Sequence, residues 1–124
     1  MKQGKKKRVY ITKTERKKCQ KVQRAFKELY EMEDILVLDA AKYGFIKLHY
    51  YEDYNFDINM IFTDSKKLFR DLWEEWRNLQ LIAMAKEPLS AGMGYKQIFL
   101  LLPKRKQNKI IRKKRYFQRK AGIR

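Results

Sequence analysis

The chain contains 124 residues, of which 44% are hydrophobic and 36% are charged, and its net charge at pH 7 is +17. This length fits one domain with a buried core, and the single cysteine, Cys19, excludes an internal disulfide or a zinc site built from several cysteines. The basic N-terminus is not followed by an apolar segment, and the longest apolar run, residues 98–103, is far shorter than the ~20 residues that cross a bilayer. We therefore expect a soluble, cytoplasmic protein.

The positive charge is concentrated at the two ends of the chain. Residues 1–27 contain twelve Lys or Arg and one acid, residues 28–103 contain eight and thirteen acids, and residues 104–124 contain eleven and no acid. The net charges of these segments are +11, −5 and +11. Two basic ends around an acidic centre are typical of a protein that binds a polyanion, and nucleic acid is the expected partner. An acidic protein, a membrane surface, or closure of the ends onto the acidic centre are the alternatives.

Residues 1–11, which include KKKR at positions 5–8, predict a flexible basic arm. The spacing of Thr12 and Glu15 is that of a capping box, so we expect a helix to begin there. An apolar stripe at spacings of three and four residues then continues to Tyr30 and places Cys19 in the core.

Three strands are expected in the middle of the chain. Residues 35–38 form a short apolar run that predicts a strand buried on both faces, and Tyr43-Gly44 predicts a turn or bulge. Residues 45–51 and 56–63 alternate between two faces, which is typical of strands. Short links between the three predict an antiparallel meander.

The remainder of the chain predicts helices. Asp64-Ser65 is an N-cap for a helix that extends to about residue 86 and ends before Pro88. Residues 95–102 predict one or two helical turns, with a strand as the alternative. Pro103 suits the first residue of a final helix, and Gly122 suits its C-cap.

The resulting fold class is α+β, with a three-stranded antiparallel meander packed by helices in the order α-β-β-β-α and followed by a basic C-terminal helical extension. The expected organisation is a basic flexible arm at residues 1–11, an α+β core domain at residues 12–102 and a basic C-terminal helix at residues 103–124.

The C-terminal segment is the strongest binding feature, because its cations cover nearly all sides of the expected helix. Such a helix fits the groove of an RNA helix or follows phosphates without reading sequence. Tyr116 and Phe117 are candidates for stacking on bases, although docking of Phe117 on the domain is the favoured interpretation. The apolar area is too small for insertion into a membrane. The predicted nucleic-acid-binding residues are Lys5, Lys6, Lys7, Arg8, Arg16, Lys17, Lys18, Lys21, Arg24, Lys104, Arg105, Lys106, Lys109, Arg112, Lys113, Lys114, Arg115, Tyr116, Arg119 and Lys120.

No catalytic residues, metal site or cofactor are expected. His49 is the single histidine, and no glycine-rich phosphate loop is present. A small metal-dependent nuclease is the enzymatic alternative, with Asp39 and Asp64 as carboxylates near strand ends that would hold Mg²⁺. The prediction is nevertheless a non-enzymatic binding protein.

The order α-β-β-β-α, with Ser65-Lys66-Lys67 opening the second long helix, is similar to a double-stranded-RNA-binding domain over about residues 14–86. The resemblance implies that this lysine pair reaches phosphates. The chain departs from that family because the second helix carries acids and two tryptophans, and because the usual preceding glycines are absent.

The segments DAAKYGFIKLHYY, TDSKKLFRDLWEEW and Leu102-Pro103-Lys104-x-Lys106-Gln107 resemble small uncharacterised proteins of phages, plasmids and integrative elements of Gram-positive bacteria. The layout also resembles some anti-CRISPR inhibitors of type II effectors. That resemblance implies stoichiometric binding to a nucleic acid or a ribonucleoprotein, and the basic termini suit a contact with guide RNA. The alternative function is an inhibitor of a Cas effector and its guide RNA, in which the acidic centre would imitate nucleic acid. The residues of this possible protein-partner surface are Glu52, Asp53, Asp57, Asp71, Glu74 and Glu75.

Overall fold

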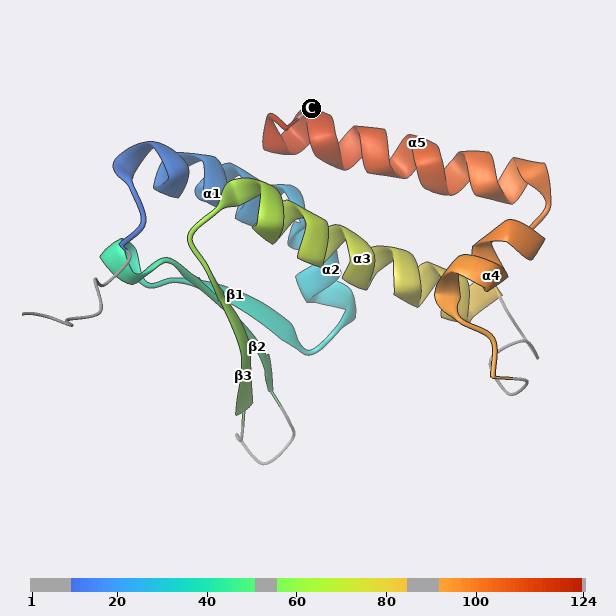
Figure 1. The fold of residues 1–124 in the computed structure, drawn as a ribbon, viewed down its shortest axis with the longest axis horizontal. Coiled ribbons are helices and arrows are strands. Elements are labelled where there is room, and N and C mark those ends of the chain that lie inside the picture. Colours follow the sequence, from blue (N-terminus) through green and yellow to red (C-terminus); the bar gives the residue numbers. More distant parts are fainter. Residues whose placement is uncertain (1–9, 51–55, 85–91, 124) are drawn as a thin grey trace, which may run out of the picture.

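The computed structural model describes residues 10–50, 56–84 and 92–123, without the side chains of residues 56–59. Along the chain the elements are α1 (Lys13–Ala25), α2 (Lys27–Met32), β1 (Ile35–Asp39), the 3-10 helix η1 (Ala41–Tyr43), β2 (Phe45–Tyr50), β3 (Phe56–Phe62), α3 (Ser65–Met84), α4 (Tyr95–Leu101) and α5 (Lys104–Ala121). The sheet is antiparallel in the order β1-β2-β3, and the helices gather on one side of it (Figure 1). The predicted α+β class with a three-stranded meander is confirmed.

One face of the sheet packs on the hydrophobic core, and on the opposite face Leu48 of β2 is also buried, at 7% exposure. Phe45 of β2 lies opposite Phe62 of β3, and both are buried together with Val37 of β1. Leu36 and Leu38 of β1 are 38% and 43% exposed, so the prediction that this strand is buried on both faces is wrong. Their side chains point to the sheet face that no described helix covers. A short apolar run in the sequence does not tell whether one or both faces of its strand are covered.

Gly44 forms the predicted turn into β2. Its φ of 105° lies in the left-handed region that favours glycine. A Cβ atom at this position would also collide with the carbonyl oxygen of Phe62. The turn therefore requires glycine for both its conformation and its close approach to β3.

The first helix is broken where a continuous helix was expected. The break lies at Phe26, whose φ of −100° and ψ of 24° separate α1 from α2. The ring of Phe26 is fully buried, stacks on Phe117 of α5 at 4.3 Å and meets the edge of Phe69 of α3 at 5.4 Å. The apolar stripe continues through the break, so the sequence spacing does not indicate it.

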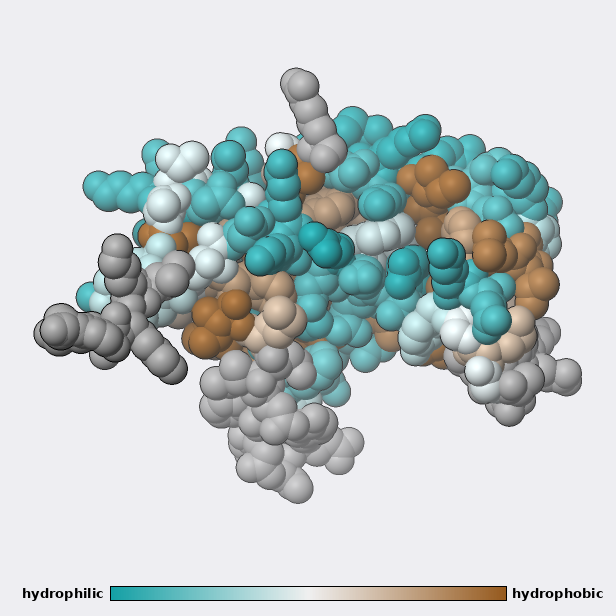
Figure 2. Space-filling view, viewed as in Figure 1, coloured by the Kyte–Doolittle hydropathy of each residue, from teal (hydrophilic) through white to brown (hydrophobic). Residues whose placement is uncertain are grey.

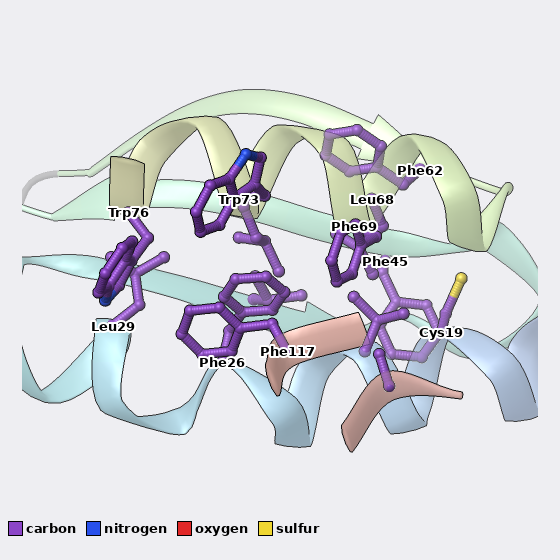
Figure 3. Packing of buried hydrophobic residues seen from close by; sticks show 14 of the residues in the cluster. Cys19, Phe26, Leu29, Phe45, Phe62, Leu68, Phe69, Trp73, Trp76 and Phe117 are labelled. Carbon is purple, nitrogen blue, oxygen red and sulfur yellow. The ribbon is translucent and has the colours of Figure 1, made fainter. Parts of the chain in front are cut away.

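Helix α5 contributes to the same core as the rest of the chain. Ile110, Phe117 and Ala121 are buried, and the ring of Phe117 contacts those of Trp73 and Trp76 (Figure 3). The helix begins after Pro103, which is the N-cap, and ends at Gly122 in the predicted left-handed C-cap. The segment expected as an extension therefore shares the hydrophobic core.

The core begins slightly before the expected boundary at residue 12. Ile11 is buried, and its N–H donates to the carbonyl of Lys42 at 3.0 Å. Tyr10 packs edge-on against Tyr43 at 5.9 Å. The remainder of the predicted arm, residues 1–9, lies outside the described residues.

Three further expectations have clear outcomes. Residues 95–101 are helical as α4, which excludes the strand alternative. Cys19 is fully buried, and burial raises the pKa of its thiol to about 12. Helix α3 is described to Met84, so its expected end before Pro88 lies outside the described residues.

In the part of the chain that the structure describes, no helix is long and apolar enough to cross a membrane.

Candidate nucleic-acid interface

The two most basic helices of the chain, α1 and α5, lie side by side in antiparallel directions (Figure 1). Their contact is close, because a Cβ atom placed on Gly122 would lie 3.8 Å from Cδ of Lys21. The stacked rings of Phe26 and Phe117 lie beneath this contact. The basic helices α1 and α5 therefore pack on the same core.

Most of the predicted binding residues in these helices are exposed. In α5 the cations are placed opposite the buried stripe of Ile110, Phe117 and Ala121 or beside it, as the helical repeat requires. Figure 2 shows hydrophilic side chains along the upper edge of the molecule, where α5 lies. The exposed predicted residues are Lys17, Lys18, Lys21 and Arg24 of α1 and Lys104, Arg105, Lys109, Arg112, Lys114, Arg115, Tyr116, Arg119 and Lys120 of α5; Arg16, Lys106 and Lys113 are half-buried.

We call the central part of this surface the α1–α5 face. It is defined by Lys17, Lys21 and Arg24 of α1 with Arg112, Arg115, Arg119 and Lys120 of α5. Two exposed cations outside the predicted set, Lys13 at the start of α1 and Lys27 at the start of α2, flank it. Their positions in the helix that is expected to begin after Thr12 could have identified these two lysines from the sequence. Lys5 to Arg8 lie outside the described residues.

Arg16 has a structural partner. Its Nη2 and Nε atoms donate to the carboxylate of Asp39 at 2.9 and 3.2 Å, and this carboxylate also accepts from Gln20 and the N–H of Ala41. The Arg16 hydrogen bond holds the pKa of Asp39 below its ordinary range, with the other two donors adding to the effect. Arg16 thus ties α1 to the end of β1.

A groove of about 360 Å³ runs between α1, α2 and α5. Its cations are Arg24, Lys27, Lys113 and Lys120, and Tyr116 lies among them with Lys113 and Lys120 at 4.4 and 5.6 Å from its ring centre. The groove also contains Glu28 and Glu31. We call it the basic groove. Phe117 is fully buried, as expected for docking, whereas Tyr116 is 37% exposed.

A second groove, of about 400 Å³, continues from the first between α2, α3 and α5. We call it the Trp76 groove. The two grooves share Glu28, Lys113 and Tyr116, and the Nζ of Lys113 donates to Oε1 of Glu28 at 2.8 Å at this junction. The other lining residues of the Trp76 groove are Met32, Trp76, Gln80, Met84, Lys109, Ile110 and Arg112.

The predicted acidic surface is partly engaged inside the molecule. Lys47 of β2 is 5% exposed, and its Nζ lies 2.6 Å from both Asp71 Oδ1 and Glu75 Oε1 of α3. Burial lowers the pKa of Lys47, but its hydrogen bonds to the two carboxylates outweigh this and raise the pKa above its ordinary value. Glu74 lines a hollow beside β3. Glu52, Asp53 and the side chain of Asp57 lie outside the described residues.

The carboxylates of the nuclease alternative have roles in the fold. Asp39 binds Arg16, and Oδ1 of Asp64 accepts the N–H groups of Lys66 and Lys67 at 2.8 and 3.1 Å, as the predicted N-cap of α3. Within residues 10–50, 56–84 and 92–123, no three His, Cys, Asp or Glu side chains cluster closely enough to hold a metal ion.

No protein-family model, curated protein or solved structure matches this chain significantly. The surfaces of the fold, above all the α1–α5 face, are therefore the basis for a functional proposal.

Proposed function

We propose that the protein binds nucleic acid through the phosphate backbone, with the α1–α5 face as its main contact and without catalysing a reaction. The supporting observation is the pairing of two cationic helices over a common buried seam. Because Phe117 packs α5 against Phe26 at the end of α1, the exposed cations of both helices are presented side by side before any partner binds. Such preorganisation reduces the entropy that binding would otherwise cost.

The cations of α5 are also largely free of internal carboxylate partners. The helix contains no acid, and among the described residues the one ion pair of α5 is that of Lys113 with Glu28. Exposed cations that the fold does not neutralise favour a polyanionic partner, since each bound phosphate releases counterions into solution.

The test compares two double variants that each remove two positive charges. Arg115→Gln/Arg119→Gln changes the α1–α5 face, whereas Lys67→Gln/Arg70→Gln changes exposed residues of α3 near β3. Binding of labelled single strands and duplexes is measured by fluorescence anisotropy over a salt series. Each lost phosphate contact lowers the slope of log K against log salt by ~0.7 on single strands and ~0.9 on duplex DNA, so we expect the first variant to lower it by ~1.4 to ~1.8.

The α3 variant should leave this slope unchanged. Equal losses in both variants would show that net charge acts without a defined surface, and the proposal would be wrong. The α3 variant also tests the resemblance to double-stranded-RNA-binding domains, because Lys67 belongs to the pair that the resemblance assigns to phosphates. A loss confined to duplex RNA in that variant would favour this mode of binding.

A further inference from the structure

The Trp76 groove differs in character from the surface that would hold phosphates. Its walls are formed by the apolar side chains of Met32, Trp76, Met84 and Ile110. Its cations, Lys109, Arg112 and Lys113, all come from α5. An apolar hollow with cations contributed from one side suits a ligand that has a flat, uncharged part and an anionic part.

The groove is continuous with the proposed phosphate surface. Arg112 belongs to both the α1–α5 face and the Trp76 groove, and Lys113 and Tyr116 line both grooves. A strand whose phosphates lie on the α1–α5 face therefore passes the opening of the Trp76 groove. The phosphates that the cations favour and the flat group that the hollow suits therefore belong to the same nucleic-acid strand.

The lining residues have the chemistry that holds a base. Tyr116 is 37% exposed at the junction and offers the more accessible ring, whereas Trp76 in the wall is 7% exposed and is stacked on Trp73. Aromatic rings stack on bases regardless of sequence, and the polarisable thioethers of Met32 and Met84 adapt to flat ligands. The volume of about 400 Å³ is within the range of sites for small organic ligands and is large enough for a base.

We propose that the Trp76 groove receives one unstacked base of a bound strand, and that the protein consequently prefers single-stranded or locally unpaired nucleic acid over a continuous duplex. This inference rests on the proposed function, because the phosphates on the α1–α5 face bring the strand to the groove. A base in a duplex must leave its stack and its pair before it enters such a site, whereas a base in a single strand has lost its pair already.

The test uses the full chain and three oligonucleotides: a single strand, the same strand with abasic positions throughout, and a duplex of half that length, so that all three carry about the same number of phosphates. We expect the single strand to bind about tenfold more tightly than the abasic strand, which is the order of one stacked base. The duplex should also bind more weakly at the same salt concentration. A 2-aminopurine placed in the single strand should lose fluorescence on binding, because stacking on an aromatic ring quenches it.

A groove-filling variant locates the effect. Gln80 is a partly exposed lining residue of α3, and Gln80→Trp places a bulky side chain in the groove. Its affinity for the single strand should fall about tenfold, to that of the abasic strand, with an unchanged salt slope. Gln80→Ala, which leaves the groove open, is the matched control and should bind like the native chain.

The outcomes separate this inference from the function on which it rests. If the native chain binds abasic and normal strands equally, no base enters the groove and the inference is overturned while phosphate binding stands. This comparison does not depend on the folding of any variant. An unchanged affinity of a folded Gln80→Trp variant for the single strand would also show that no base enters the groove. Absence of binding to every oligonucleotide at low salt overturns both proposals.

Discussion

Glu15 joins the first turn of α1 to the first turn of α3. Its N–H donates to Oγ1 of Thr12 at 3.1 Å, as the predicted capping box requires. Its carboxylate does not complete that box, because Oε1 accepts the N–H and the hydroxyl of Ser65 at 2.8 and 3.0 Å. The hydrogen bond from the Ser65 N–H is the main cause that lowers the pKa of Glu15, although burial opposes it.

Replacement of this carboxylate should therefore weaken the fold. We expect Glu15→Gln to lower the free energy of unfolding by ~1 kcal/mol at pH 7, the order of one helix cap. Because the folded-state pKa is lowered, the contribution is present above the unfolded value of ~4.3 and is lost as pH falls through the folded pKa. Urea unfolding at pH 7 and near pH 3 measures this.

The two stability curves should converge at the lower pH. The matched control is Glu33→Gln, since Glu33 is exposed and its side chain has no hydrogen bond among the described residues. An equal loss in the control, or a difference that persists in acid, would contradict the role assigned to Glu15.

Lys47 shows how far the contacts of a residue can be predicted from the local sequence pattern. The alternation of residues 45–51 correctly placed Lys47 on the same face as Phe45. The partners of its ammonium, Asp71 and Glu75, are one helical turn apart on α3. Their spacing was visible in the sequence, but their position above β2 depends on how α3 crosses the sheet, which no local pattern determines.

At the scale of elements, α5 depends on one aromatic side chain. Phe117 is fully buried, and the centres of the Phe26 and Trp76 rings lie 4.3 and 5.5 Å from the centre of its own ring. Truncation of such a buried aromatic removes apolar burial and leaves a cavity. Without acids for favourable pairs along its own length, α5 has little helical stability apart from this packing.

We expect Phe117→Ala to lower the free energy of unfolding by ~3–5 kcal/mol and to reduce the helical signal in circular dichroism. Denaturant titrations followed by circular dichroism measure both effects. Ile111→Ala is the control, because Ile111 lies on the same helix but is 40% exposed, and its loss should be below ~1 kcal/mol. A folded Phe117→Ala variant with native stability would show that α5 does not depend on this seam.

Most of the elements could be predicted from the sequence, and their exceptions have physical causes. The period of two in residues 56–63 and the N-cap at Asp64 predicted β3 and the start of α3. The break at Phe26 could not be predicted, because the fit of this ring between α3 and α5 accompanies it. The exposed face of β1 could not be predicted either, because it depends on the side of the sheet that the helices occupy.

At the scale of the whole molecule, the fold places like charges together. The sequence has two ends of +11 each, but it does not show that α1 and α5, about ninety residues apart, lie side by side. Phe26 at the end of α1 stacks on Phe117 at this contact. The candidate site could thus be predicted as a set of residues, whereas its shape and the Trp76 groove required the tertiary structure.

Repulsion across this surface should make stability depend on salt. Between ~10 mM and ~150 mM salt the screening length falls from ~30 to ~8 Å, so we expect Tm to rise by several degrees, with ~4 °C for each kcal/mol of repulsion relieved. Nucleic-acid affinity should fall over the same range. Thermal melts in a sodium chloride series measure the first effect.

The response should be smaller in Arg115→Gln/Arg119→Gln than in Lys67→Gln/Arg70→Gln, because the first variant relieves part of the repulsion in advance. A Tm that falls with added salt would mean that ion pairs outweigh the repulsion of the α1–α5 face.

The two tryptophans have a practical consequence. Trp73 and Trp76 are the whole tryptophan content of the chain, and their stacked rings lie 5.4 Å apart beneath α5. Ammonium groups of that helix, on Lys114 and Lys113, lie 6.0 and 5.8 Å from the two ring centres. The indole emission of the unlabelled protein therefore reports the environment under α5, and both the docking of this helix and the arrival of a ligand in the adjacent groove become visible in a fluorimeter.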